Sequence, residues 1–181
     1  MMKKLMCALL LLAVCAGAAS AESSVLVAYF SATGHTAPIA EYIAQSLGAD
    51  LYEIVPAEPY TDADLNYNDS SSRATAEQND STCRPALAGE LPDMSGYDIV
   101  IIGHPIWWGQ APKLIYTFIE SCDLSGKTVT SFCTSASSGL GSSADNLRAD
   151  LPDSVNWLTS RRFPIGASDA EVQEWLDEVM G

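Results

Sequence analysis

The chain has 181 residues, 48% of them hydrophobic, so it is long enough to form one domain with a substantial core. It carries 23 acidic and 9 basic side chains, and its formal net charge is −14. This charge argues against nucleic acid as a partner, because nucleic-acid binding needs a basic footprint. It suits steering toward a partner protein with a basic face, and it is equally well explained by an acidic surface that only keeps the domain soluble.

The first 21 residues have the pattern of a secretory signal peptide. Two lysines near the start precede an apolar run, Leu5–Val14, that is too short to span a bilayer as a helix, and Ala19–Ala21 supplies a small-residue cleavage site. We predict cleavage of residues 1–21 and an exported (periplasmic or extracellular) domain over residues 22–181, with no stable membrane insertion after cleavage. Loss of the two lysines leaves 7 basic and 23 acidic side chains, a charge of −16. Lipoprotein anchoring at Cys15 fits less well, because a bulky valine precedes it.

Apolar, β-branched segments recur along the chain and predict five strands. They are Ser24–Phe30, Leu51–Val55, Tyr97–Gly103, Thr128–Thr134 and a weaker Val155–Leu158. Helical patterns occupy residues 37–47, 73–79, 112–121 and 144–151, and a last helix begins at the capping box of Ser168 and Glu171. This alternation predicts an α/β fold, a three-layer α/β/α sandwich around a five-stranded parallel sheet, with no second domain.

The segment Tyr60–Leu91 is the least regular part of the chain and is rich in Asp, Asn and Ser. Its low hydrophobicity predicts a long surface connection with one short helix near Arg73–Asn79. Long connections of this kind often carry function, so a mobile lid over a ligand is one expectation for it.

The first strand runs directly into a loop of small and hydroxylated residues, Ser31–Thr36, and then into a helix. Gly34 permits a positive φ and close backbone approach, and the first N–H groups of the helix point back into the loop. Thr36 can cap this helix. The arrangement predicts a phosphate site. Because the loop has no Lys or Arg and no Walker pattern, a bound monophosphate fits it better than a transferring triphosphate.

Two further loops follow strands that are expected to end at the same edge of the sheet, where ligands of such folds bind. One is Pro105–Gly109, which contains the adjacent Trp107 and Trp108, and the other is Thr134–Ser142. The two tryptophans either plug the end of the sheet or form a wall for a flat aromatic ligand. Because neighbouring side chains in an extended loop diverge, we expect one of them to stack on the ligand, and which one is left open.

Together the three loops resemble those of flavodoxins. The pattern Ser-x-Thr-Gly-x-Thr after VLVAYF is similar to their phosphate loop, and PIWWG and FCTSASSGLG resemble the flavin-contacting loops of a bacterial flavodoxin-like family, over about Ser24 to Val179. The resemblance implies the strand order 2-1-3-4-5 and non-covalently bound FMN. It also implies a phosphate loop and two walls for the isoalloxazine ring. The phosphate loop is Ser31, Ala32, Thr33, Gly34, His35 and Thr36; one wall is Pro105, Ile106, Trp107, Trp108 and Gly109; the other is Thr134, Ser135, Ala136, Ser137 and Gly139.

A flavin supplies the redox chemistry itself, so no catalytic side chain is predicted. The expected function is electron transfer through FMN, with a redox partner protein that has a basic face or with a small-molecule acceptor. The alternatives are an FMN-dependent reductase of a small acceptor such as a quinone, and a redox-inactive binding domain that keeps the fold. An acidic, aromatic-walled site disfavours added negative charge, so a low reduction potential is expected.

Cysteine and histidine residues add few candidates. Cys83, Cys122 and Cys133 are widely spaced and form no CxxC pair, so no metal site is predicted, and in a parallel sheet they lie too far apart for an intramolecular disulfide. A thiolate role for Cys133 needs a nearby positive group, and the sequence places none there. His104 either donates to the flavin or substrate or is a loop residue whose own hydrogen bonds are satisfied, and the second reading fits better.

Overall fold

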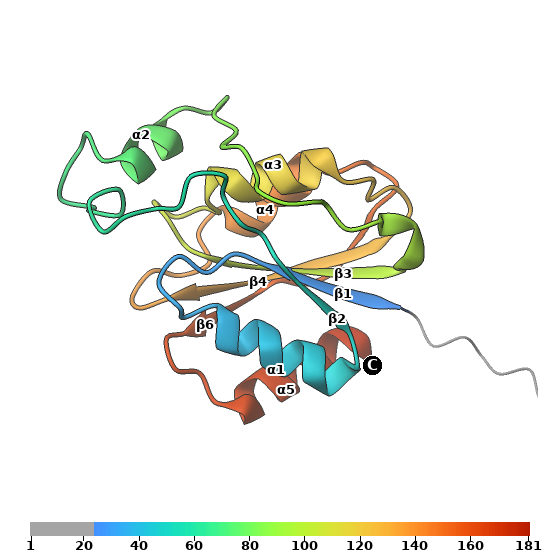
Figure 1. The fold of residues 1–181 in the computed structure, drawn as a ribbon. Helices are drawn as coiled ribbons and strands as arrows, with labels where there is room; N and C mark the ends of the chain where they lie inside the picture. Colours follow the sequence, from blue (N-terminus) through green and yellow to red (C-terminus); the bar gives the residue numbers. More distant parts are fainter. Residues whose placement is uncertain (1–23) are drawn as a thin grey trace, which may run out of the picture.

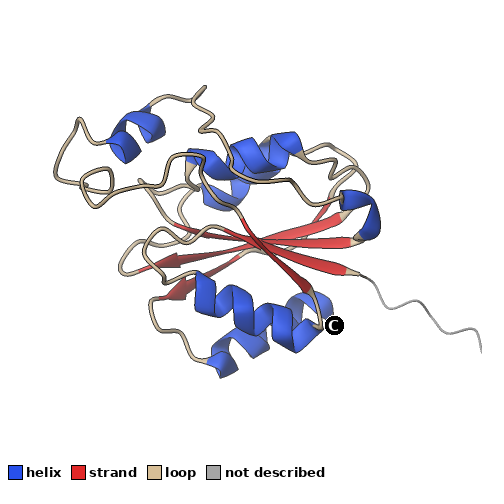
Figure 2. Ribbon diagram, viewed as in Figure 1, coloured by secondary structure: helices blue, strands red, loops and turns tan. Residues whose placement is uncertain are grey.

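The computed structural model describes residues 24–181, so the predicted signal peptide lies outside the described residues. Strands and helices alternate as expected (Figures 1 and 2). The strands are β1 (Val25–Tyr29), β2 (Asp50–Glu53), β3 (Ile99–Pro105), β4 (Thr128–Ser135), β5 (Asn156–Trp157) and β6 (Arg161–Pro164). The helices are α1 (Ala37–Leu47), α2 (Arg73–Asn79), the 3-10 turn η1 (Met94–Gly96), α3 (Lys113–Ser121), α4 (Ser143–Ala149) and α5 (Asp169–Met180).

The strands form one parallel sheet in the order β2-β1-β3-β4-β5, which confirms the predicted topology. Helices α1 and α5 cover one face and α3 and α4 cover the other (Figure 1). The two faces bury separate clusters because side chains alternate along each strand. In β1, Leu26 packs under the α3 side, whereas Val27 packs under α1 and α5. In the second cluster Trp175 of α5 is fully buried between Phe132 and Phe163.

The fifth position of the sheet differs from the expectation of a single strand. β5 pairs the first half of β4, and β6, which was not predicted, pairs the second half in parallel. The two are separated because the chain leaves the ladder at Thr159 and Ser160. There the hydroxyl of Thr130 donates to the Thr159 carbonyl (2.9 Å), and the Ser131 hydroxyl pairs with that of Ser160 (2.9 Å). Side-chain hydroxyls on β4 therefore replace backbone pairing at the break.

Two helix ends follow the local signals in the sequence. The capping box of Ser168 and Glu171 is present at the start of α5, as predicted. Helix α1 ends at Gly48, which has a left-handed φ of 61°. In the part of the chain that the structure describes, no helix has the length and apolar character needed to cross a membrane.

Candidate functional site

The three loops singled out in the sequence meet at the carboxyl edge of the sheet around a cavity of about 470 Å³. Each loop contributes to its lining: Thr33 and His35; Pro105, Ile106, Trp107 and Trp108; and Thr134, Ser135, Ala136 and Ser137. The other predicted residues belong to the same loops without lining the cavity: Ser31, Ala32, Gly34, Thr36, Gly109 and Gly139. Four lining residues were not predicted, namely Leu65, Tyr67, Ser138 and Ile165.

Ser31, rather than Thr36, caps helix α1. The Ser31 Oγ accepts the N–H groups of Thr36 (3.1 Å) and Ala37 (3.2 Å). Thr36 stands at the N-cap position, but its side chain makes no capping hydrogen bond, so the prediction that it caps the helix is wrong. The reason is a nearer partner, because the buried Thr36 hydroxyl lies 2.8 Å from the hydroxyl of Thr134. This bond joins the first loop to the third.

The first loop offers several hydrogen-bond donors to a ligand. Among the described residues, the N–H groups of residues 32–35 donate to no protein acceptor. Because the Ser31 oxygen already accepts two N–H groups, its own O–H remains free to donate. Gly34 has a φ of 78°, so the chain turns there as a glycine permits. This donor set at a helix N-terminus fits a phosphate held without Lys or Arg.

The second loop presents Trp108 on a tight turn. The backbones of Trp107 and Gln110 bond reciprocally at 3.0 and 3.1 Å, and the two residues between them, Trp108 and Gly109, have φ values of 48° and 76°. Two positive φ values define a type I′ turn, which ordinarily takes Asn or Gly. Within residues 24–181, Trp108 is the one non-glycine residue with a positive φ. Strained backbone of this kind is concentrated at ligand and active sites, which makes this turn a candidate part of the site.

The turn separates the two tryptophans. Trp107 is 4% exposed and packs edge-on against Phe30 (5.7 Å) and Tyr60 (5.1 Å). Trp108 is 41% exposed, and its ring lies 5.8 Å from that of Tyr67. Trp107 therefore plugs the end of the sheet, and Trp108 is the ring that remains available to a flat ligand. The interpretation as a plug applies to Trp107, and a flavin wall formed by Trp108 stays a prediction.

The third loop is held from two sides. Arg162 of β6 donates to the carbonyl of Ser135 (2.6 Å), and the Ser135 hydroxyl accepts the N–H of Ser138 (2.9 Å). Further along, Ser142 N–H donates to the carbonyl of Gly109 (3.0 Å). The loop that forms one wall of the cavity therefore rests directly on the turn that forms the other wall.

The electrostatics of the site are set by burial and by the absence of charge. No Asp, Glu, Lys or Arg is among the described residues that line the cavity. Burial raises the pKa of the Cys133 thiol to about 12, and the nearby Arg162 opposes that rise only in part. The expectation that no positive group lies near Cys133 is wrong, because β6 was not predicted and Arg162 stands beside Cys133 in the ladder. Cys133 is nonetheless a neutral thiol, since burial prevails.

His104 is a buried structural residue in strand β3. Its Nδ1 lies 2.9 Å from the carbonyl of Pro105, so Nδ1 carries the proton, and its Nε2 accepts from the Ser143 hydroxyl at 3.2 Å. Burial lowers its pKa to about 4, so the ring is neutral near pH 7. His104 does not line the cavity, and the interpretation of it as a satisfied residue agrees with this geometry.

Of the four lining residues that sequence reasoning missed, Ser138 lies in the third loop and the other three come from outside the three loops. Leu65 and Tyr67 belong to the irregular segment before α2, and Ile165 follows β6. Ile165 is an exposed apolar residue at the end of a strand, a signal that was hidden because β6 itself was not recognised. No periodic pattern surrounds Leu65 and Tyr67, so their position could not have been read from the sequence.

This fold and site define a class: a flavodoxin-like α/β domain with a donor-rich loop beside a cavity lined by aromatic side chains. A family model described as flavodoxin matches residues 24–179, and the chain belongs to this family. No curated protein matches the sequence significantly.

Solved structures resemble the chain over most of its length. A presumed flavoprotein from Bacteroides eggerthii is 46% identical with a TM-score of 0.82, over 88% of this chain and 99% of that one. One from Bacteroides uniformis is 45% identical with a TM-score of 0.81, over 86% and 98%. A flavoprotein from Lactobacillus acidophilus, crystallised in complex with FMN, is 25% identical with a TM-score of 0.68, over 85% and 99%.

Proposed function

We propose that this protein binds FMN non-covalently and transfers electrons through it. The observation that carries the proposal is that a single cavity joins a loop of unpartnered N–H groups to the exposed ring of Trp108. Its volume of about 470 Å³ lies within the range of roughly 300–1,000 Å³ that is usual for small-molecule sites. Membership of the flavodoxin family and the FMN complex of a related flavoprotein support FMN as the cofactor.

Different residues of the chain would bind the phosphate and the ring of this cofactor. Ser31 and the N–H groups of residues 32–35 would bind the phosphate, with Thr33 and His35 at the mouth of the loop. Trp108 would contact one side of the isoalloxazine ring, and residues 134–138 would line the other. FMN, when bound, supplies one- and two-electron chemistry to the site. The lining contains no Lys or Arg to stabilise negative charge gained on reduction, which favours a low reduction potential.

The principal alternative is an FMN-dependent reductase of a small acceptor such as a quinone. It is favoured by the apolar side chains at the cavity, since Tyr67, Trp108 and Ile165 are all exposed there by 41% or more. A carrier that serves a partner protein needs an accessible cofactor edge but no apolar pocket for an acceptor. A domain that keeps the fold without redox activity is the third possibility.

Titration of the purified mature protein with FMN tests the proposal. We expect quenching of flavin fluorescence with saturable binding, and a reversible bleaching of the bound flavin when dithionite is added. Steady NAD(P)H- or quinone-dependent turnover by the protein alone would favour the reductase over the carrier. A protein that takes up no FMN would leave the redox-inactive binding domain as the remaining possibility.

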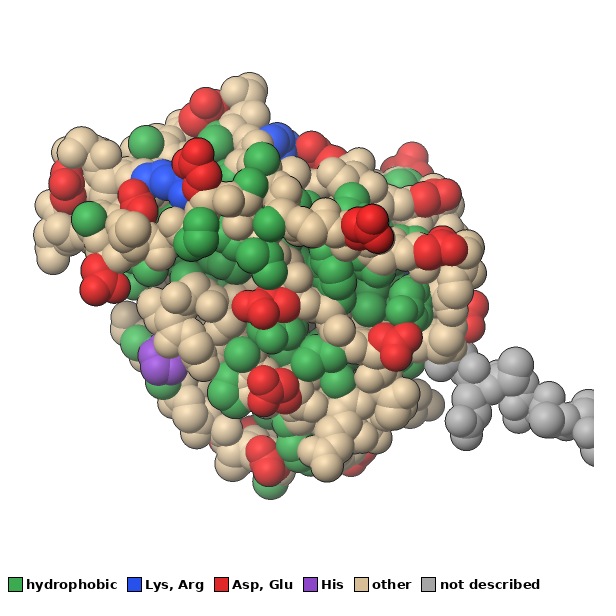
Figure 3. All heavy atoms as spheres, in the orientation of Figure 1, with side chains coloured by type: hydrophobic (Ala, Val, Ile, Leu, Met, Phe, Trp, Pro, Cys, Tyr) green, Lys and Arg blue, Asp and Glu red, His purple; other side chains and the backbone are tan. Residues whose placement is uncertain are grey.

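We infer that the protein is exported and meets a partner with a basic face. The mature charge of −16 supports such a partner, and acidic side chains are spread over the face shown in Figure 3. Cell fractionation with amino-terminal sequencing of the recovered protein tests export, and an amino terminus at Glu22 is the expected result. A flavin spectrum of the exported fraction shows whether FMN is bound after export.

A further inference from the structure

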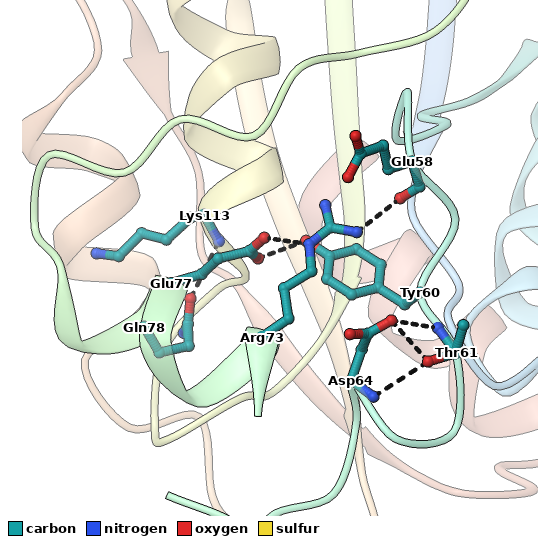
Figure 4. A network of polar contacts seen from close by, with 8 residues as sticks. All are labelled: Glu58, Tyr60, Thr61, Asp64, Arg73, Glu77, Gln78 and Lys113. Atoms are coloured by element: carbon teal, nitrogen blue, oxygen red, sulfur yellow. Dashed lines mark hydrogen bonds and ion pairs between the residues drawn. The ribbon is translucent and has the colours of Figure 1, made fainter. Parts of the chain in front are cut away.

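Helix α2 is joined to the tryptophan turn by one buried side chain, Gln78. Its Nε2 donates to the carbonyls of Trp107 (2.9 Å) and Ala111 (3.2 Å), and its Oε1 accepts the N–H of Lys113 (3.1 Å). Gln78 is 5% exposed. A single amide therefore connects three elements: helix α2, the turn that carries Trp108, and the first turn of α3. Figure 4 shows Gln78 beside Lys113.

The chemistry of its partners fixes the orientation of this amide. Both carbonyls can only accept and the Lys113 N–H can only donate, so the Gln78 nitrogen must face the turn and its oxygen must face α3. Both N–H bonds of the amide are used. The carbonyl of Trp107, the residue just before the strained Trp108, is thereby fixed relative to α2.

A second set of contacts fixes α2 to the segment that precedes it. Glu77, which is 9% exposed, accepts from Arg73 (2.7 Å) and from the Tyr60 hydroxyl (2.6 Å), and Arg73 also donates to the carbonyl of Glu58 (2.8 Å). The guanidinium of Arg73 lies 4.1 Å from the centre of the Tyr60 ring (Figure 4). The Tyr60 ring packs in turn on Trp107. These contacts hold residues 58–60 against α2, the short helix that the sequence predicted, so residues 58–79 form one unit although most of residues 61–71 are exposed.

This unit reaches the cavity with two side chains. Thr61 and Asp64 form a compact turn, in which the Asp64 carboxylate accepts the N–H (2.8 Å) and the hydroxyl (2.7 Å) of Thr61 (Figure 4). Directly after this turn, Leu65 and Tyr67 line the cavity, and the Tyr67 ring contacts that of Trp108 at 5.8 Å. The unit therefore touches the site through side chains and supports it through Gln78.

We propose that residues 58–79 form a third wall of the flavin site, and that Gln78 is the positioning residue that fixes Trp108 against the flavin ring. This inference rests on the proposed function, because it assumes that FMN occupies the cavity. A rigidly held ring binds a flat ligand without having to be ordered first, so the contribution of Gln78 belongs to the isoalloxazine and not to the phosphate. Tyr67 is the ring-contacting residue of this wall.

The test compares FMN with riboflavin, which carries its ring without the phosphate, and with inorganic phosphate, which carries no ring. Dissociation constants for FMN and riboflavin are measured by flavin fluorescence, and that for inorganic phosphate by competition with FMN, in wild type, Gln78→Met, Gln78→Glu and Tyr67→Ala. Gln78→Met removes the amide at similar size, and Gln78→Glu sets a carboxylate against two carbonyl oxygens. Gln173→Met is the matched control, because Gln173 bonds only within the opposite layer, to Tyr42 and Asp177.

For the Gln78 variants we expect affinity for FMN and riboflavin to fall together, by about tenfold in Gln78→Met and more in Gln78→Glu, with phosphate affinity unchanged. Tyr67 is 69% exposed, so Tyr67→Ala is expected to leave folding intact and to weaken the binding of both flavins several-fold. Gln173→Met leaves all three constants unchanged.

Three results would overturn the inference, and they differ from one another. Wild-type flavin affinity in the Gln78 and Tyr67 variants would refute the third wall while leaving the proposed function intact. An equal loss for phosphate and flavins would show that Gln78 acts only on overall structure. Failure of the wild type to bind FMN would refute the proposed function, and the inference with it.

Discussion

The backbone of Gly141 rests against the carbonyl of Gly109 so closely that a β-carbon at position 141 would collide with the carbonyl oxygen and carbon. Gly141 also has a φ of 60°, which side chains other than glycine rarely adopt. This contact packs the third loop directly against the tryptophan turn. The glycine of the third loop that the structure constrains is therefore Gly141, and Gly139, which the sequence singled out, has open space around it.

Gly141→Ala is expected to destabilise the protein by about 1–3 kcal/mol, because both the left-handed φ and the collision must be accommodated. The turn must also shift, so FMN affinity falls. Urea denaturation and FMN titration measure the two effects. Gly139→Ala is the matched control two residues away, expected within about 0.5 kcal/mol of wild type. Equal effects of the two substitutions would contradict this account of the loop.

Removal of Trp107 should mainly lower stability, whereas removal of Trp108 should mainly weaken FMN binding. Trp107→Ala opens a cavity in the core and is expected to cost about 3–5 kcal/mol. Trp108→Gly should change the free energy of unfolding by less than about 1 kcal/mol, because relief of the positive φ offsets the lost contact with Tyr67. The same change should weaken FMN binding by about tenfold or more.

Thermal unfolding of the apo protein measures the effect of each tryptophan substitution on stability, and flavin fluorescence measures its effect on FMN binding. A Trp108→Gly protein that binds FMN as tightly as wild type would show that the exposed ring is not the flavin wall.

The hydroxyl pair of Thr36 and Thr134 can be tested by a double-mutant cycle. Thr36→Val leaves the Thr134 hydroxyl buried without its partner, and we expect a loss of about 1–3 kcal/mol. Replacing both by valine should cost less than the sum of the single changes, since no polar group is then left unpaired. Urea denaturation of the four proteins gives the coupling energy, and a value near zero would mean that the bond does not join the loops.

Local and periodic signals account for what the sequence predicted correctly. Parallel-sheet strands such as β1 and β3 are buried on both faces and read as continuous apolar runs, and the loops after them are recognisable by Ser31–Gly34 and Trp107–Gly109. The position of these loops at one edge follows from the sheet topology alone. The fold class and the meeting of the loops could thus be predicted from the residues, whereas the strand order was implied by the resemblance to flavodoxins.

The remaining features depend on long-range contacts that leave no local pattern. Whether Thr36 caps its helix is decided by Thr134, 98 residues away, and the role of Gln78 is decided by carbonyls about 30 residues away. The break between β5 and β6 depends on hydroxyls of β4. Such partners are chosen by tertiary packing, which overrides the local preference of each residue.

The buried histidine makes stability depend on pH. Because burial lowers the pKa of His104 to about 4 from an ordinary value of 6.5, the unfolded chain binds a proton between these values that the folded chain does not. Stability is therefore unaffected by this group above pH 6.5 and falls by up to about 1.4 kcal/mol per pH unit as the pH drops toward 4. Urea denaturation from pH 7.5 to 4.5 measures the slope.

In His104→Gln the slope of the free energy of unfolding against pH should be smaller by the contribution of about one proton, whatever the substitution does to stability at pH 7.5. Surface carboxylates also contribute below pH 5, since hydrogen bonds from Ser71, Thr82 and Ser125 lower the pKa values of Asp69, Asp80 and Asp123, and this contribution is the same in both proteins. His35→Gln, in the exposed first loop, controls for the loss of an imidazole in general. If His104→Gln and wild type lose stability in parallel between pH 6.5 and 4.5, then His104 is not held neutral by the fold.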